Sequence, residues 1–313
     1  MSIQNRHALK AAAGEALAAA PGHQKLVLIS AGAAAALSLA VSALNFILQG
    51  QIAGTGGLGG LGLRSVLSTV QSLLSLAMTL VLPFWSLGYV SAVLKLSRGE
   101  GASPDTLLDG FRRLGPALRL LLLTEVLYIV LGVVCVNAGS VLFSLTPLVR
   151  PLYDLMLPML TDPNALEALD TGALLEAAAP MLIGCLVLFA AVAIPLSYRL
   201  RMARLRLMDD PGAGAFAALR SSSRMMKGSC LQLLRLDLSF WWFYLAEAAV
   251  MVLGYGDVLI PALGISLPMA SDAAYFLFYV LGLLAQLGLY LFARNRVEVT
   301  YAKAYDALLQ SGI

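Results

Sequence analysis

The sequence has 313 residues, of which 59% are hydrophobic and only 12% are charged, with a formal net charge of +3. A soluble globular domain is about one quarter charged, so this composition excludes a sizeable soluble domain and indicates a polytopic membrane protein. The small net charge gives no indication of nucleic-acid binding. The three cysteines form no CxxC pattern, so neither a zinc site nor a disulfide framework is predicted.

Six apolar stretches can cross a bilayer as helices, since a span needs about 20 predominantly apolar residues. They lie at residues 26–48, 66–94, 118–145, 178–198, 236–253 and 273–292. Short amphipathic or basic segments separate several of them, and we expect these segments to form helices on the membrane surface. The predicted fold is all-α: a single membrane domain over 1–313, with about six transmembrane helices and short interfacial cytoplasmic helices.

Lysine and arginine are distributed unequally between the two sets of connections. Residues 1–25, 95–119, 199–235 and 294–313 carry 3, 5, 8 and 3 of them, which is 19 of the 21 in the chain. The other two are Arg64 and Arg150. Because cytoplasmic loops are enriched in basic residues, we expect both termini to be cytoplasmic, an even number of spans, and a place in the cytoplasmic membrane.

The most basic connection, residues 199–235, contains a predicted helix over Gly214–Lys227. Arg220, Arg224 and Lys227 lie on one face of it at spacings of four and three. Gly228 is suited to end the helix. Such a basic face can bind anionic lipid headgroups or a protein partner, although basic loops also serve orientation alone. The apolar residues on the other face are expected to turn towards the acyl chains: Phe216, Leu219 and Met226.

Three acidic residues lie in or beside predicted spans: Glu125, Asp237 and Glu247. A charge inside a span is costly, so such residues are candidate functional residues that line a polar site. Each also has a structural interpretation. Glu125 can pair with Arg119 or a basic residue of another helix, and Asp237 with Arg235 or Ser239. Glu247 is the deepest of the three, and we expect it to be paired or hydrated inside the bundle.

Catalysis has little support in the sequence. Its two histidines, His7 and His23, both precede the first span, which leaves no HExxH motif and no Ser-His-Asp set. The protein is therefore predicted not to be an enzyme, and no cofactor, metal or catalytic residue is assigned.

The string AFAALRSSSRMMKG, followed by LQLLRLDLSF, resembles the signature of the domain-of-unknown-function 975 family of uncharacterised bacterial membrane proteins. The segment KLSRGEGASPDTLLDGFRRLG and the ending VTYAKAYDAL are also similar to the family, with Ala304 where phenylalanine is usual. Pro261-Ala262 departs from the family's Pro-Tyr. The resemblance implies a helical bundle of several spans and no known activity. The matching signature residues are Ala218, Leu219, Ser222, Met226, Lys227, Gly228, Leu236, Asp237, Leu238, Ser239 and Phe240.

Two functions fit these features. The first is a non-catalytic membrane protein with an accessory, scaffolding or envelope-homeostasis role, which engages anionic lipid headgroups or an unidentified membrane-protein partner through its basic helices. The second is a transporter or channel for a small solute, with Glu125 or Glu247 lining the path. A polar, water-accessible cavity at mid-membrane would favour the second function. A bundle closed by Leu, Ala and Gly contacts would favour the first.

The orientation is testable by labelling of cysteines introduced at Gly57, Asp170 and Gly212 in a variant without the three native cysteines. In intact cells, the first two should react with an impermeant thiol reagent and the third should not, because the charge distribution places only Gly212 in the cytoplasm. The opposite labelling pattern would exclude this topology.

Overall fold

The computed structural model describes residues 5–54, 61–161, 171–262, 264–266 and 271–311, and every regular element in these ranges is a helix. Five helical stretches are long and apolar enough to cross a membrane, or six if one bent pair is counted as a span. This confirms the predicted all-α, multi-pass architecture. By their internal contacts the residues divide into two compact units, Met1–Leu118 with Met202–Ile313, and Arg119–Arg201.

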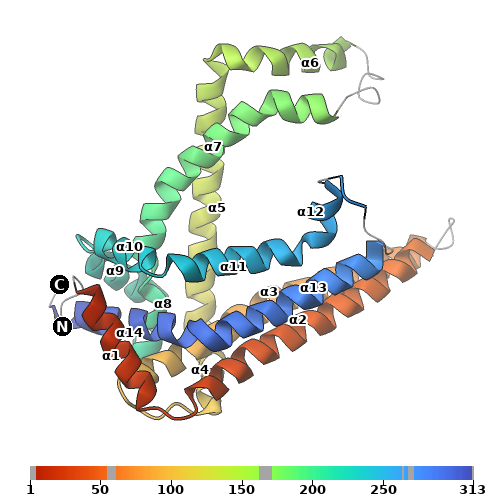
Figure 1. Ribbon diagram of the computed structural model, residues 1–313. Helices are drawn as coiled ribbons and strands as arrows, with labels where there is room; N and C mark the ends of the chain where they lie inside the picture. Colours follow the sequence, from red (N-terminus) through yellow and green to blue (C-terminus); the bar gives the residue numbers. More distant parts are fainter. Residues whose placement is uncertain (1–4, 55–60, 162–170, 263, 267–270, 312–313) are drawn as a thin grey trace. The chain divides into compact units, whose positions relative to one another are not determined.

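The predicted spans coincide largely with helices, most of which continue beyond the apolar stretch at one or both ends, although the fifth span is interrupted at residues 239–240. They correspond to α2 (His23–Gly54), α3 (Leu61–Ser97), α5 (Leu114–Ser144), α7 (Thr171–Leu200), α11 (Trp241–Gly254) and α13 (Ser271–Leu289). In the first unit, α2 contacts both α3 and α13, and α13 also contacts α11 (Figure 1). The order of contact is therefore α3, α2, α13, α11.

The fifth predicted span is not one straight helix. It consists of α10 (Cys230–Leu238) and α11, which meet at 67°. Because α11 has 14 residues and is about 21 Å long, it does not cross a 30 Å hydrocarbon core alone. The Nζ atom of Lys10 donates a hydrogen bond of 2.8 Å to the carbonyl oxygen of Ser239 at this break. Burial lowers the pKa of Lys10, with smaller contributions from Arg296 and Arg6.

The sixth span continues without a break into the C-terminal tail. After α13 come a π-helical segment, η5 (Tyr290–Arg294), and then α14 (Asn295–Gln310). The N-terminal helix α1 (Arg6–Ala18) packs on α14 (Figure 1). The buried face of α1 consists of Leu9, Ala13 and Leu17, spaced by four residues. The amphipathic N-terminal segment thus turns its apolar face towards protein.

The segment after α3 is likewise packed against protein. It forms the 3-10 helix η2 (Pro104–Leu108) and the single turn α4 (Asp109–Arg112), both in contact with α3. Gly88 of α3 and Gly110 of α4 permit this contact, since a Cβ atom on Gly88 would collide with the carbonyl oxygen of Leu107. A side chain on Gly110 would meet the carbonyl oxygen of Phe84 in the same way.

The predicted helix Gly214–Lys227 is α9 (Ala215–Met225), which packs on α8 (Ala203–Asp209). Gly228 follows it with a φ of +85°, as expected for a glycine that ends a helix. The expected apolar face is only partly right. Met226 is fully buried within the protein, whereas Phe216 is 74% exposed. The sequence pattern could not distinguish burial against α8 from burial in lipid.

Within the first unit, an ion-pair network joins the end of α3 to α8 and α14. We call the elements around it, α1, η2, α4, α8, α9 and α14, the basic end. The guanidinium of Arg98, directly after α3, bridges Asp209 of α8 and Asp306 of α14, the latter at 2.8 Å. These hydrogen bonds raise the pKa of Arg98, and the one with Asp209 contributes most. Tyr305 Oη also donates to Asp209, at 2.9 Å. Arg98 therefore holds three helices together.

A second charged cluster secures α4 to α3. Asp109 accepts hydrogen bonds from Ser91 at 2.8 Å, Lys95 at 3.3 Å and Arg112 at 3.0 Å. Burial by itself would raise the pKa of Asp109, but the hydrogen bonds from Ser91 and Lys95, with the charge of Lys95, outweigh it and lower that pKa. The carboxylate therefore remains charged and keeps its partners at neutral pH.

The second unit consists of α5 from Arg119 onward, α6 (Arg150–Thr161) and α7. No element was predicted from the sequence at the residues that form α6. Helices α5 and α7 touch where Gly139 faces Cys185, and a Cβ atom on Gly139 would come within 2.5 Å of the Cys185 sulfur. Cys135, one turn earlier on the same face of α5, is buried. Small residues thus bring these two spans together.

Candidate functional site

Glu247 of α11 has a hydrogen-bonding partner on the neighbouring span. Tyr290 Oη donates to its Oε1 atom at 3.0 Å, and Gln286 Nε2 donates to Tyr290 Oη at 3.1 Å. Tyr290 and Gln286 are four residues apart, so both lie on the face of α13 and η5 that turns towards Glu247. The deepest carboxylate predicted from the sequence is therefore part of a short chain of polar groups between two spans.

Asp237 of α10 lies beside the break before α11. It accepts a hydrogen bond from Tyr301 Oη of α14, and the hydroxyls of Tyr301 and Tyr244 are 2.6 Å apart. The expected contact with Ser239 is not formed, because the Ser239 hydroxyl donates to the carbonyl oxygen of Leu236 at 2.5 Å. Asp237 thus connects α10 to the C-terminal helix, which gives it a structural role at the break.

Glu125 belongs to α5 in the other unit and is exposed. Among the residues that the structure describes, it has neither an ion pair nor a hydrogen bond. Farther along α5, Cys135 is buried and Gly139 contacts Cys185 of α7. The three carboxylates therefore do not form one cluster, and only Asp237 and Glu247 share a unit.

The predicted headgroup contacts lie together at the surface of the basic end. Arg220 and Arg224 are exposed on α9, and Lys227 is exposed in the turn that follows it. The opposite face of α9 is buried at Ala215, Ala218, Ser222 and Met225. Because that face is held by the protein, the three cations and Phe216 point outwards.

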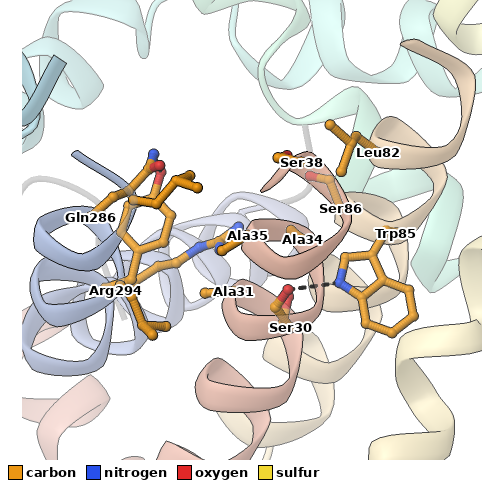
Figure 2. Close-up of a pocket in the computed structure, with 13 residues that line it drawn as sticks. Ser30, Ala31, Ala34, Ala35, Ser38, Leu82, Trp85, Ser86, Gln286 and Arg294 are labelled. Carbon is orange, nitrogen blue, oxygen red and sulfur yellow. Dashed lines mark hydrogen bonds between the residues drawn. The ribbon is translucent and has the colours of Figure 1, made fainter. Parts of the chain in front are cut away.

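The first cavity lies between α2, α3 and the junction of α13 with η5, and has a volume of about 250 Å³. Gln286 and Arg294 lie on one side of it, with Ser38 and Ser86 on the other (Figure 2). Trp85 also lines the cavity, and its Nε1 atom donates to the carbonyl oxygen of Ser30 at 2.9 Å. The cavity thus has both polar and apolar walls between the spans.

A second cavity, of about 570 Å³, continues along the same helices and shares Ser38 with the first. Ser42 Oγ and Tyr275 Oη lie 3.0 Å apart at its wall, and the Oδ1 atom of Asn45 is buried without a hydrogen-bonding partner. We call the polar residues that line the two cavities the polar track. Its members are Ser38, Ser42, Asn45, Gln49, Gln71, Ser75, Ser86, Tyr275, Tyr279, Gln286, Tyr290 and Arg294.

A third cavity, of about 830 Å³, lies on the other side of α13, against α11 and α12 (Gly256–Ala262). Glu247 lines it, together with Tyr275, Tyr279 and Gln286 of the polar track. The hydrogen bond between Tyr290 and Glu247 therefore connects residues that line the first and third cavities.

The polar track was not predicted, although its signal is present in the sequence. Ser38, Ser42, Asn45 and Gln49 are spaced by four, three and four residues, which places them on one face of α2. On the last span, spacings of four, seven, four and four residues join Tyr275, Tyr279, Gln286, Tyr290 and Arg294. Hydropathy averaged over a span conceals such a face, because most residues in the window are apolar.

Within the described residues, no group of three or more His, Cys, Asp or Glu side chains is placed to hold a metal ion.

Residues 9–292 match the family described as Protein of unknown function (DUF975). The chain belongs to this family. No curated protein and no solved structure matches the chain. The resemblance found in the sequence is thus confirmed over nearly the whole length, and the family supplies no activity for this DUF975 member.

Replacing Glu247 with Leu should lower the melting temperature in detergent, because it removes the acceptor for the Tyr290 hydroxyl. The expected loss is about 1–2 kcal/mol, the range for such hydrogen bonds between spans. Glu247→Gln keeps an acceptor and should lose less. Adding Tyr290→Phe to Glu247→Leu removes the stranded hydroxyl and should restore part of the stability. If Glu247→Leu melts like the wild type, the hydrogen bond contributes nothing measurable.

Proposed function

We propose that this DUF975 protein is a non-catalytic membrane transporter or channel, in which the polar track forms the path of a small polar solute. The observation that supports this function is the alignment of polar faces from α2, α3 and α13 along two contiguous cavities. Polar residues inside membrane spans are rare and usually line a substrate or water path. This is the second of the two functions expected from the sequence.

The faces of α2 on either side of the polar track support the same function. Leu39, Leu44 and Ile47 alternate with track residues and are 36%, 42% and 58% exposed, as residues that contact lipid would be. Serine and threonine in an apolar helix commonly bond to their own backbone, as Ser72 and Thr79 do with the carbonyls four residues earlier. Asn45 lines the second cavity, and among the described residues its buried Oδ1 atom accepts no hydrogen bond.

A water-filled path is testable by cysteine substitution at Ser38, Ser42 and Asn45, with Leu39, Leu44 and Ile47 as matched lipid-facing controls on the same helix. The thiolate that reacts with maleimides or methanethiosulfonates forms only where water reaches the thiol. In membranes without native cysteines in the protein, the track cysteines should react at least about tenfold faster than the controls. Equal rates in both sets would mean that the track is closed and the proposed path is wrong.

We further propose that the basic end faces the cytoplasm in the bacterial cytoplasmic membrane and binds anionic lipid headgroups through Arg220, Arg224 and Lys227. The exposure of these three cations beside the 74% exposed Phe216 supports this interaction. Each cation near an anionic surface contributes about 1 kcal/mol. Such binding would favour one position of α9 at the membrane, in keeping with the accessory role that the sequence first suggested.

The triple variant Arg220→Gln, Arg224→Gln and Lys227→Gln should remain in the membrane but co-purify with less anionic lipid. The charge-preserving variant Arg220→Lys with Arg224→Lys should retain the lipid, since the attraction depends on charge. Lipid content is measured by mass spectrometry of the purified protein. An unchanged content in the triple Gln variant would show that this face serves topology alone, or binds a protein partner.

A further inference from the structure

Arg294 is held in an unusual position for a basic residue near the end of a span. It lies in the π-helical segment η5, and its guanidinium carbon is 4.3 Å from the ring centroid of Tyr89 and 4.5 Å from that of Tyr290. Its side chain extends from η5 towards α2 at Ala35 and lines the first cavity (Figure 2). π-Helical turns within α-helices occur frequently at functional sites.

Arg294 has no carboxylate directly beside it among the described residues. In the described part of the chain it forms no ion pair, whereas Arg98, Arg112 and Arg206 each have an aspartate partner. The two aromatic rings orient the guanidinium but offer it no carboxylate oxygen. A half-buried cation between membrane spans is costly unless an anion is bound beside it, so the first cavity offers a place where an anion would be stabilised.

We infer that the first cavity is a subsite for a singly charged oxyanion, such as a carboxylate or a phosphodiester, with Arg294 as the residue that binds it. This inference rests on the proposed function and assigns a chemical class to the solute. Arginine presents its N–H groups in a planar fork that matches two oxygens of one oxyanion. Among the described residues, Arg294 is the only charged side chain that lines the cavity. Its single positive charge therefore balances one negative charge on a ligand but not two.

Neutral donors complete the subsite. The hydroxyls of Ser38 and Ser86 line the cavity and donate to no group in the described residues, so both are available to an oxyanion. Gln286 Nε2 already donates to Tyr290 Oη. The volume of about 250 Å³ accommodates a small solute or the headgroup of a lipid. Either source presents a singly charged oxyanion to Arg294.

The test uses the fluorescence of Trp85, which lines the same cavity, in a full-length variant with Trp241→Phe and Trp242→Phe. Sodium butyrate and its neutral analogue butyramide are titrated in one arm. Dihexanoyl phosphatidylglycerol and dihexanoylglycerol, which lacks the phosphate, are titrated in the other. We expect a saturable change with at least one anionic probe and none with its neutral analogue. Saturation by butyrate indicates a soluble carboxylate, and saturation by the phospholipid alone indicates a headgroup.

Arg294→Gln should weaken binding of the anionic probe by about tenfold or more, as expected for the loss of a charged hydrogen bond. Arg294→Lys keeps the positive charge but loses the planar pair of N–H donors, so it should weaken binding less than Arg294→Gln. If the Gln variant does not fold, the Lys variant provides the test. Arg296→Gln, an exposed arginine two residues away, is the matched control and should bind within about twofold of the parent. Equal affinity in the parent and both Arg294 variants, or no anion-dependent change at all, would refute the subsite.

Failure of the subsite and failure of the path have different signatures. If Arg294-dependent binding is found while the track cysteines do not react with the thiol reagent, the subsite stands and the path is wrong. If the track cysteines react but neither anionic probe binds, the path stands and Arg294 has no anion to bind.

Discussion

Polar side chains on a helix inside hydrocarbon must face another polar group or water, and the first unit of this protein is arranged to meet that constraint. Three spans carry a polar face on an otherwise apolar surface, and α2 lies in contact with both of the others. Ser38, Ser42 and Asn45 of α2 are half-buried there and line the cavities. The same arrangement leaves cavities, because these side chains are too few and too short to fill the space between the helices.

Two arginines near the ends of spans illustrate different uses of the same residue. Arg98 is bonded to Asp209 and Asp306 and joins α3, α8 and α14 into one body. Arg294 has only the rings of Tyr89 and Tyr290 beside it and opens onto a cavity. The same residue type thus serves as a structural bridge at Arg98 and lines a cavity at Arg294.

The two irregularities in the spans occur where polar groups gather. The break between α10 and α11 adjoins Asp237, which accepts a hydrogen bond from Tyr301, while the π-helical segment contains Tyr290 and Arg294. Regular helices would point such groups along fixed directions set by 3.6 residues per turn. A bend or a wider turn redirects them towards neighbouring helices. Both features therefore position polar groups of the candidate site and of the structural contacts around it.

The sequence by itself determined the class of protein, the location of the spans, the basic end and the family. Hydropathy and charge depend on consecutive residues, and the Met226-Lys227-Gly228 and Leu236–Phe240 motifs are local. Only the tertiary structure decided that the apolar faces at Leu9, Leu107 and Met226 are buried against protein, and that the fifth span is bent. The polar track likewise required the fold, because Asn45, Gln71 and Tyr279 are far apart in sequence and form one surface only when three spans meet.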